Sequence, residues 1–276
     1  MKNKNYLTIL LLIFCLAFGQ NAYKYKLSSL ETEKIKKAKK LEKIGRIEEA
    51  EYIYKEILTN KPFIKEALNP LKEIYTNQNK INNCLPYIEE YLKSHNNNIY
   101  KQIEVIDIYL AINDPKWKEI INNVAAFSKN RKYFSQTKKV IYSLLNHNQT
   151  SDAIELISML RTHWEKPSFY AFELGQYFTL KNEYSNAIDQ FLLFNKYNQN
   201  TTTTISNNIM NLLDFGANEN LIREKLNNTD SNESKIILFE LEFKLKNYDS
   251  CYNIIKILND DNLKIIFIRD LIKLDM

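Results

Sequence analysis

The sequence predicts an all-α protein, and three observations support that prediction. The 276 residues include only 4 Gly and 5 Pro, too few for the many tight corners of an all-β sandwich or barrel. The glycines are scattered singly, whereas the phosphate-binding loops of parallel α/β folds need glycines at short fixed offsets. The hydrophobic content of 45% is ordinary for a folded chain and argues against disorder. The length fits one or two globular domains or one extended array.

Residues 1–19 have the pattern of a secretory signal peptide. Lys2 and Lys4 form a short positive region, and the apolar run Leu7 to Phe18 follows. The small residues Ala17 and Gly19 then stand where signal peptidase requires them. We therefore expect cleavage after Gly19 and export, to the periplasm or the medium if the source is bacterial.

Two alternatives to a cleaved signal peptide remain. An uncleaved anchor would have to span the bilayer with the apolar run 7–18, which is shorter than the ~20 residues that a spanning helix needs. Lipidation at Cys15 would require a small residue before the cysteine, and Phe14 is bulky. No second long apolar run follows, so the sequence predicts no membrane span after cleavage.

The charge of the chain is mildly positive, +5 overall, and 5 − 2 = +3 once the two leader lysines are removed. A nucleic-acid-binding protein usually concentrates its basic residues on one face or tail. The densest basic run, residues 34–43, is interrupted by Glu42, and Ile35, Ala38 and Leu41 recur through it at helical spacing. We interpret it as an amphipathic helix with a solvated charged face; the alternative is a surface for an acidic partner.

The residues that usually carry chemistry are sparse and dispersed. Cys84 and Cys251 are too few for an exported disulfide scaffold, so we expect them to be buried and not paired with each other. His95, His147 and His163 show no ligand spacing and no accompanying acidic or cysteine cluster. The acid pairs at 48–49 and 89–90 are expected on exposed helix faces, where nothing raises a carboxyl pKa for catalysis. The sequence predicts no enzyme, metal site or cofactor.

A period of 34 residues runs through the body of the chain, a sign of a repeat architecture. Its turn position holds residues that tolerate a left-handed backbone: Gly45, Asn79, Asn148, Asn182 and Gly216. Small residues, where two helices cross closely, follow at Ala50, Cys84, Ala153 and Ala187. A shorter last unit spans 235–258, with Tyr248 at its turn position and Cys251 at its small position. The interval from Cys84 to Ala153 is two periods plus one residue, so a further unit is expected within 99–131, with Lys118 at its small position. Trp117 and Trp164 border turns and are expected to pack in the local core.

This pattern resembles the tetratricopeptide repeat family over roughly residues 31–258. The residues that carry the resemblance are Ala38, Leu41, Gly45, Ala50, Tyr54 and Pro62 in one copy and Leu174, Gly175, Phe178, Tyr184, Ala187 and Phe191 in another. The resemblance implies a right-handed superhelical solenoid of about six to seven stacked antiparallel helix pairs. It would occupy residues 30–276 after an N-terminal extension at 20–29, with a capping helix at 262–275.

One segment of the last unit has the sequence pattern of a strand. Residues 239–246 alternate apolar and charged side chains, which is a strand pattern. A helix instead places Leu238, Leu241, Leu245 and Tyr248 on one stripe. Because the neighbouring segments are helical, we expect a helix here as well.

The resemblance also implies where a partner would bind, because the first helix of each pair lines the concave face in this family. The inward positions are Lys39, Glu42, Asn69, Glu73, Tyr100, Asp107, Lys138, Tyr142, Phe172 and Gln176. They include three aromatic side chains that could anchor a polypeptide segment; the alternative is that these aromatics pack between repeats. The set lacks the Asn, Lys and Arg clamp with which some members hold a C-terminal carboxylate.

The expected function is therefore a non-enzymatic exported scaffold that binds a protein or peptide partner on its concave face. The alternative is a fixed accessory subunit of an envelope or outer-membrane assembly or secretion complex. A glycan-acting enzyme hidden in an all-α array is a third, minor option.

Overall fold

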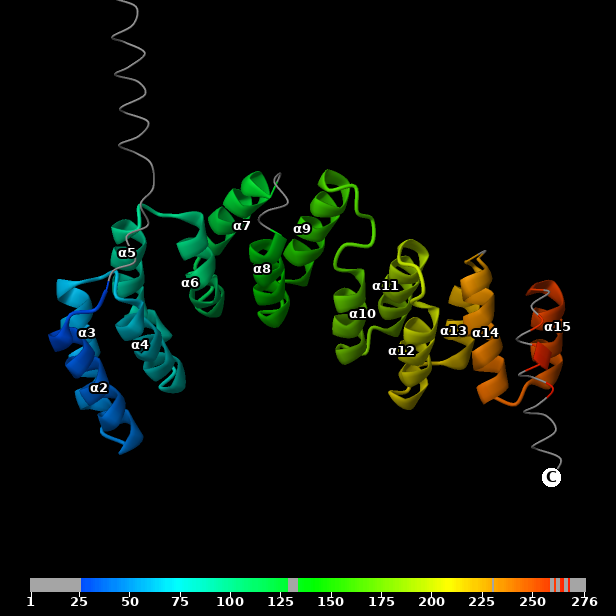
Figure 1. The fold of residues 1–276 in the computed structure, drawn as a ribbon, viewed down its shortest axis with the longest axis horizontal. Coiled ribbons are helices and arrows are strands. Elements are labelled where there is room, and N and C mark those ends of the chain that lie inside the picture. The colour runs from blue at the N-terminus through cyan, green and yellow to red at the C-terminus, as the bar shows by residue number, and fades with distance from the viewer. Residues whose placement is uncertain are drawn as a thin grey trace, which may run out of the picture. The chain divides into compact units, whose positions relative to one another are not determined.

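The computed structural model describes residues 26–128, 134–229 and 231–258, together with residues 261, 264, 265 and 268. In this part of the chain the regular structure is entirely helical, with fourteen α-helices, α2 to α15, and no strand (Figure 1). The predicted all-α fold is confirmed. The predicted leader at 1–19, most of the extension at 20–29 and most of the capping helix at 262–275 lie outside the described residues.

The chain divides into two compact units, the first ending at Asn96 and the second beginning at Asn97. The first unit contains α2 (Ser29–Lys43), α3 (Ile47–Asn60), α4 (Lys65–Asn77), the 3-10 helix η1 (Ile81–Cys84) and α5 (Leu85–Ser94). Within it, α2 packs on α3, α3 packs on α4, and η1 contacts both α4 and α5. Neighbours in the sequence are therefore neighbours in space.

The second unit continues this arrangement over ten helices. They are α6 (Ile99–Ala111), α7 (Lys116–Phe127), α8 (Phe134–Asn146), α9 (Thr150–His163), α10 (Ala171–Leu180), α11 (Tyr184–Tyr197), α12 (Thr202–Asp214), α13 (Glu219–Asn227), α14 (Asn232–Lys244) and α15 (Tyr248–Leu258). Helices α6, α8, α10 and α14 each pack against the helix that follows. Contacts also skip one helix, from α6 to α8, α7 to α9, α11 to α13 and α12 to α14. Each helix is thus held by local partners, in chain order (Figure 1).

Seven turns between helices share one backbone conformation. A residue with positive φ stands in each of them: Gly45, Asn79, Asn113, Asn148, Asn182, Gly216 and Lys246. The intervals stay close to one period, for example 113 − 79 = 34 and 148 − 113 = 35, and only the last is shorter. Five of the six turn residues predicted from the period are among the seven. The sixth, Tyr248, was predicted for the shorter last unit and is wrong, because it begins α15 and Lys246 holds the turn. Asn113 is the turn residue of the further unit that was expected between Cys84 and Ala153. The one extra residue of that interval lies between Asn113 and Asn148.

The same hydrogen bond closes all seven turns. The N–H after each left-handed residue donates to the carbonyl five positions earlier, as in Lys80 to Tyr75 at 2.8 Å, Glu183 to Phe178 at 2.9 Å and Asn247 to Glu242 at 2.8 Å. This is the six-to-one bond of a Schellman motif, which satisfies a carbonyl that a helix end would otherwise leave unpaired. Gly and Asn recur here because they adopt the left-handed conformation at low cost.

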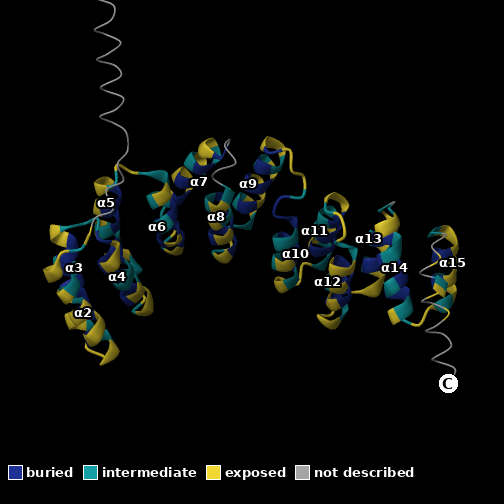
Figure 2. Cartoon of the chain, viewed as in Figure 1, coloured by how far each residue is buried: buried dark blue, intermediate teal, exposed yellow. Residues whose placement is uncertain are grey.

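The buried faces of the helices match the predicted small positions with one exception (Figure 2). The side chains of Ala50, Cys84, Ala153, Ala187 and Cys251 are completely buried, as predicted. Lys118 is exposed, so its assignment to a small position is wrong. Trp117 faces the core of that unit instead, so the buried position of α7 comes one residue earlier than the fixed spacing predicts. Trp164 is also buried, as expected.

The segment with a strand pattern is helical, as the neighbouring helices led us to expect. Residues 239–244 belong to α14, and Leu241 is fully buried while Leu238 is nearly so. The apolar and charged residues alternate in the sequence because one of the charged residues, Glu242, lies on the buried side of the helix. A charged residue therefore lies on the core side of this helix.

The two cysteines are free and buried, as predicted. Burial raises the pKa of Cys84 to about 12 and the pKa of Cys251 to about 11. A thiol is nucleophilic only as the thiolate, so both should be inert while the protein is folded.

We expect iodoacetamide at pH 8.5 to label neither thiol in the folded chain from Gln20 onward, and both in urea, as measured by intact-mass spectrometry. Burying the two thiols in their neutral form also makes stability depend on pH, because their pKa values are higher in the folded than in the unfolded chain. The contribution of the buried thiols to the free energy of unfolding is complete below about pH 9 and declines as the pH rises toward 11. Labelling of the folded protein at the rate seen in urea would show that these sites are open.

Candidate functional site

The second unit carries an open groove of about 660 Å³ between α6, α8 and the start of α10. Its walls come from three helices that alternate along the chain. The lining residues are Tyr100, Ile103, Glu104, Asp107, Gln136, Lys138, Lys139, Tyr142, Ser143, Tyr170 and Glu173. Aromatic, acidic, basic and amide side chains thus share one surface.

Three tyrosines give the groove most of its aromatic surface, and they differ in exposure. Tyr142 is 62% exposed and Tyr100 is 40% exposed, whereas Tyr170 is 7% exposed. Burial, with smaller contributions from the charge of Glu173 and from Tyr142, raises the pKa of Tyr170 to about 12. Its hydroxyl stays neutral at physiological pH, and Tyr142 and Tyr100 present the more exposed rings of the three.

The charged side chains of the groove largely neutralise one another. Lys138 Nζ lies 2.6 Å from Glu173 Oε1 and 5.6 Å from the centre of the Tyr170 ring. Glu104 faces Lys101 at 3.3 Å. Because opposite charges are already paired, the groove offers hydrogen bonds and aromatic contact more than a strong net potential.

A smaller apolar cleft adjoins the groove. It shares Tyr100, Ile103 and Gln136 with the groove and adds Phe127 and other side chains of α6, α7 and α8. Phe127 is 48% exposed, which is unusual for so large an apolar ring. This cleft has an accessible volume of only about 10 Å³, about that of one water molecule, so it extends the apolar edge of the groove without forming a separate pocket.

Four of the ten predicted partner-binding residues lie together in the groove: Tyr100, Asp107, Lys138 and Tyr142. Phe172 instead packs on α11, with its ring centre 5.4 Å from that of Phe194. Gln176 is exposed on α10. The α10 assignments are displaced because the helix starts only at Ala171, after a left-handed Tyr170.

The other four predicted residues belong to the first unit. Lys39 on α2 and Glu73 on α4 are exposed, and Asn69 on α4 is half-buried. Glu42 on α2 is half-buried and accepts a hydrogen bond from the Tyr54 hydroxyl, so it is engaged within its own helix pair.

Sequence reasoning missed seven lining residues. Ile103, Glu104 and Lys139 stand one helical turn from predicted residues, so the helical repeat alone could have found them. Gln136 and Ser143 are close along α8 to Lys138 and Tyr142. Tyr170 and Glu173 could not be found from the period, because they depend on the place where α10 begins.

The histidines take separate positions. His95 Nδ1 lies 2.8 Å from the Tyr91 carbonyl oxygen, His163 is exposed, and His147 Nε2 lies 3.6 Å from Asp107 Oδ1. Among the described residues, no group of three or more His, Cys, Asp or Glu side chains is placed to hold a metal ion.

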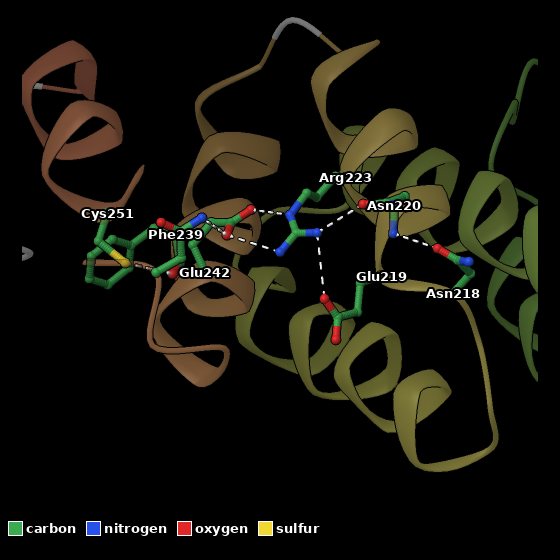
Figure 3. Close-up of polar contacts among 8 residues, drawn as sticks. Asn218, Glu219, Asn220, Arg223, Phe239, Glu242 and Cys251 are labelled. Atoms are coloured by element: carbon green, nitrogen blue, oxygen red, sulfur yellow. Dashed lines mark hydrogen bonds and ion pairs between the residues drawn. The ribbon is translucent and has the colours of Figure 1, made fainter. Parts of the chain in front are cut away.

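A second polar cluster joins α13 to α14 (Figure 3). Arg223 of α13 binds Glu242 of α14 with two hydrogen bonds, Nε to Oε1 at 2.6 Å and Nη2 to Oε2 at 3.3 Å. The Asn247 amide donates to the same carboxylate at 3.0 Å. Its polar atoms satisfy one another, so we assign this cluster to helix packing.

The chain matches no protein-family model, and no curated protein is significantly similar to it in sequence. Within the described residues, no helix has the length and apolar character needed to cross a bilayer.

Proposed function

We propose that the protein is an exported, non-enzymatic scaffold of the tetratricopeptide type that binds a polypeptide segment in the groove of α6, α8 and α10. The observation that carries this proposal is the groove itself, which three alternate helices line. In a stack of helix pairs, alternate helices share one face, and that face forms an extended binding surface.

The repeated turns support the tetratricopeptide-like solenoid. Seven left-handed residues close to one period apart, each followed by the same backbone hydrogen bond, define seven helix pairs. In the second unit, the contacts of α6 with α8, α7 with α9, α11 with α13 and α12 with α14 are those expected of stacked pairs.

The chemistry of the groove favours a polypeptide of low net charge. Tyr100 and Tyr142 provide large rigid rings with polar tips, which anchor segments at low entropic cost. Gln136 and Ser143 add hydrogen-bonding groups to the lining. The leader pattern of residues 1–19 supports the assignment to the periplasm or to the secreted proteins if the source is bacterial.

The proposal is tested by replacing Tyr142 with alanine. A photo-crosslinking amino acid introduced at Lys139 identifies the partner by mass spectrometry from native envelopes. We expect Tyr142→Ala to lower the affinity for that partner at least tenfold, as for aromatic anchors of other interfaces. The melting temperature should stay unchanged.

Tyr252→Ala is the matched control, because Tyr252 is also 62% exposed but lies on α15. Its affinity should equal that of the wild type. If Tyr142→Ala binds the partner as well as Tyr252→Ala does, the groove is not the binding surface.

A fixed place in an envelope complex is the second candidate, favoured by exposed apolar residues at successive turns. Leu180 is 82% exposed and Phe215 is 61% exposed, and the Tyr184 hydroxyl donates to the Phe215 carbonyl. A permanent neighbour would cover them. Co-purification of a stoichiometric complex that survives Tyr142→Ala would favour this candidate.

A further inference from the structure

The outer face of α2 is a lysine-rich surface without partners. Lys36, Lys40 and Lys43 follow one another at intervals of four and three residues, so they share one side of the helix. Lys37 and Lys39 flank them, and all five side chains are exposed. None of the five has an ion pair with another described residue. We call these five residues the lysine face.

The acids of α2 do not neutralise the lysine face. Glu31 is buried and paired with Lys61, and Glu42 accepts the hydrogen bond from Tyr54. Only Glu33 is exposed on this helix. It lies one turn before Lys36 and Lys37 and offsets one of the five positive charges, which leaves the lysine face with a net charge of 5 − 1 = +4. Meanwhile Ile35, Ala38 and Leu41 bury the opposite side of α2 against its neighbours. The helix is therefore strongly amphipathic, with its positive side open.

Two aliphatic side chains frame the lysine face. Leu30 and Ile44 are 61% and 67% exposed at the two ends of α2. They lie seven residues before and after Lys37 and so fall on the same side of the helix. An acidic protein partner would explain the lysines alone. A bilayer surface explains both, because lysines meet anionic headgroups while aliphatic side chains enter the headgroup boundary.

The position of α2 in the sequence agrees with a membrane surface. The helix begins at Ser29, eleven residues after the apolar run Leu7 to Phe18. If the leader acts as its sequence predicts, that run enters the bilayer during export, and α2 would then be tethered close to the headgroups.

We propose that the lysine face of α2 docks the protein on a membrane surface rich in anionic phospholipid. The contact is peripheral, and it is independent of the groove. It would hold the scaffold near the membrane after the leader is removed.

The test uses the chain from Gln20 onward and sedimentation with vesicles of phosphatidylcholine, with and without phosphatidylglycerol. We expect binding only with phosphatidylglycerol, and its loss when salt shortens the Debye length to about 3 Å. The triple variant Lys36→Gln, Lys40→Gln, Lys43→Gln should lower the partition coefficient by on the order of 100-fold.

The matched control is the triple variant Lys118→Gln, Lys196→Gln, Lys256→Gln. These lysines are exposed but dispersed over α7, α11 and α15, so both variants have the same net charge. We expect the control to bind nearly as the wild type does. Melting curves establish that both variants fold.

Three results would overturn the proposal: no dependence on phosphatidylglycerol, an equal loss in both variants, or binding to soluble polyglutamate without binding to vesicles. The last result would assign the lysine face to an acidic protein. None of these results affects partner binding by the Tyr142→Ala variant. The membrane-docking proposal can therefore fail without the groove proposal failing.

Discussion

Replacing Arg223 with alanine is expected to lower the free energy of unfolding by about 3 kcal/mol, the cost of leaving a buried charge without its partner. The Glu242 side chain is only 4% exposed and that of Arg223 is 27% exposed. Without the guanidinium, the carboxylate keeps the Asn247 amide as its remaining side-chain partner. Urea denaturation measures the difference.

The geometry of the cluster explains why the expected effect is large (Figure 3). Two parallel N–H···O bonds hold the Arg223 fork on the carboxylate of Glu242, and such bidentate pairs are among the strongest hydrogen bonds in proteins. Arg223 Nη1 also donates to Asn220 Oδ1 at 3.1 Å. Arginine thus fixes α13 on α14 at one register.

Two further variants separate the buried pair from surface electrostatics. Glu219 lies 3.5 Å from Arg223 with its side chain half-exposed, so Glu219→Gln should change stability by no more than about 0.5 kcal/mol. The double variant Arg223→Met, Glu242→Leu should recover most of the lost stability, because apolar residues often replace buried ion pairs without cost. Denaturation curves of Arg223→Ala and wild type that coincide would contradict the assignment.

Glu242 shows what the sequence could have predicted once the turns were aligned. Its carbonyl accepts the closing bond of the last turn. In the other six units the accepting residue is apolar or aromatic: Leu41, Tyr75, Tyr109, Leu144, Phe178 and Leu212. A glutamate at this position stands out in the printed sequence. Its partner Arg223 does not, because nothing local connects residues 19 positions apart.

The turns themselves were largely predictable, because Gly and Asn tolerate positive φ for reasons of covalent geometry. Lys246 was not, since a lysine in that conformation (φ 59°) is uncommon. Here the unit is shortened, and packing overrides the local preference. The exposed Lys118 was misassigned for a related reason: fixed spacing ignores the residue at which each helix begins.

The groove was predicted in part, and the boundary lies at the loop before α10. The register implied by the tetratricopeptide resemblance named Tyr100, Asp107, Lys138 and Tyr142, which lie on one surface because α6 and α8 are neighbours. The connection to α10 contains two left-handed residues, Glu165 and Tyr170. It delays the helix start, so Glu173 rather than Phe172 lines the groove. Such loop conformations depend on tertiary contacts, which no periodicity encodes.

Replacing Gly175 with alanine should destabilise the protein, although the local preference predicts the opposite sign. A glycine inside a helix costs about 1 kcal/mol relative to alanine, so an unhindered site would gain stability. A Cβ at Gly175, however, would lie 2.5 Å from Phe191 Cε1 and 2.6 Å from Phe191 Cδ1. The glycine was predicted as a close-crossing residue, and this distance shows how close the crossing of α10 and α11 is.

The Phe191 ring has little freedom to yield. It is 1% exposed, and its centre lies 5.9 Å from that of Phe172. Overpacking a closed core costs typically 1–3 kcal/mol, so we expect Gly175→Ala to lower the free energy of unfolding by about 2 kcal/mol. Gln176→Ala, next in the same helix and exposed, is the control and should change stability by less than about 0.5 kcal/mol.

A double-mutant cycle identifies the clash as the cause. Phe191→Leu removes the ring atoms that the new methyl group would meet, so Gly175→Ala should cost much less in that background than in the wild type. If instead Gly175→Ala raises the melting temperature of the wild-type chain, helix propensity outweighs packing and the two helices are not closely crossed. If the cost is the same in both backgrounds, the strain lies in the backbone of α10. The close crossing of α10 and α11 is supported only if the loss of stability caused by Gly175→Ala disappears when Phe191 is replaced. This crossing holds α10, which also lines the groove, against α11.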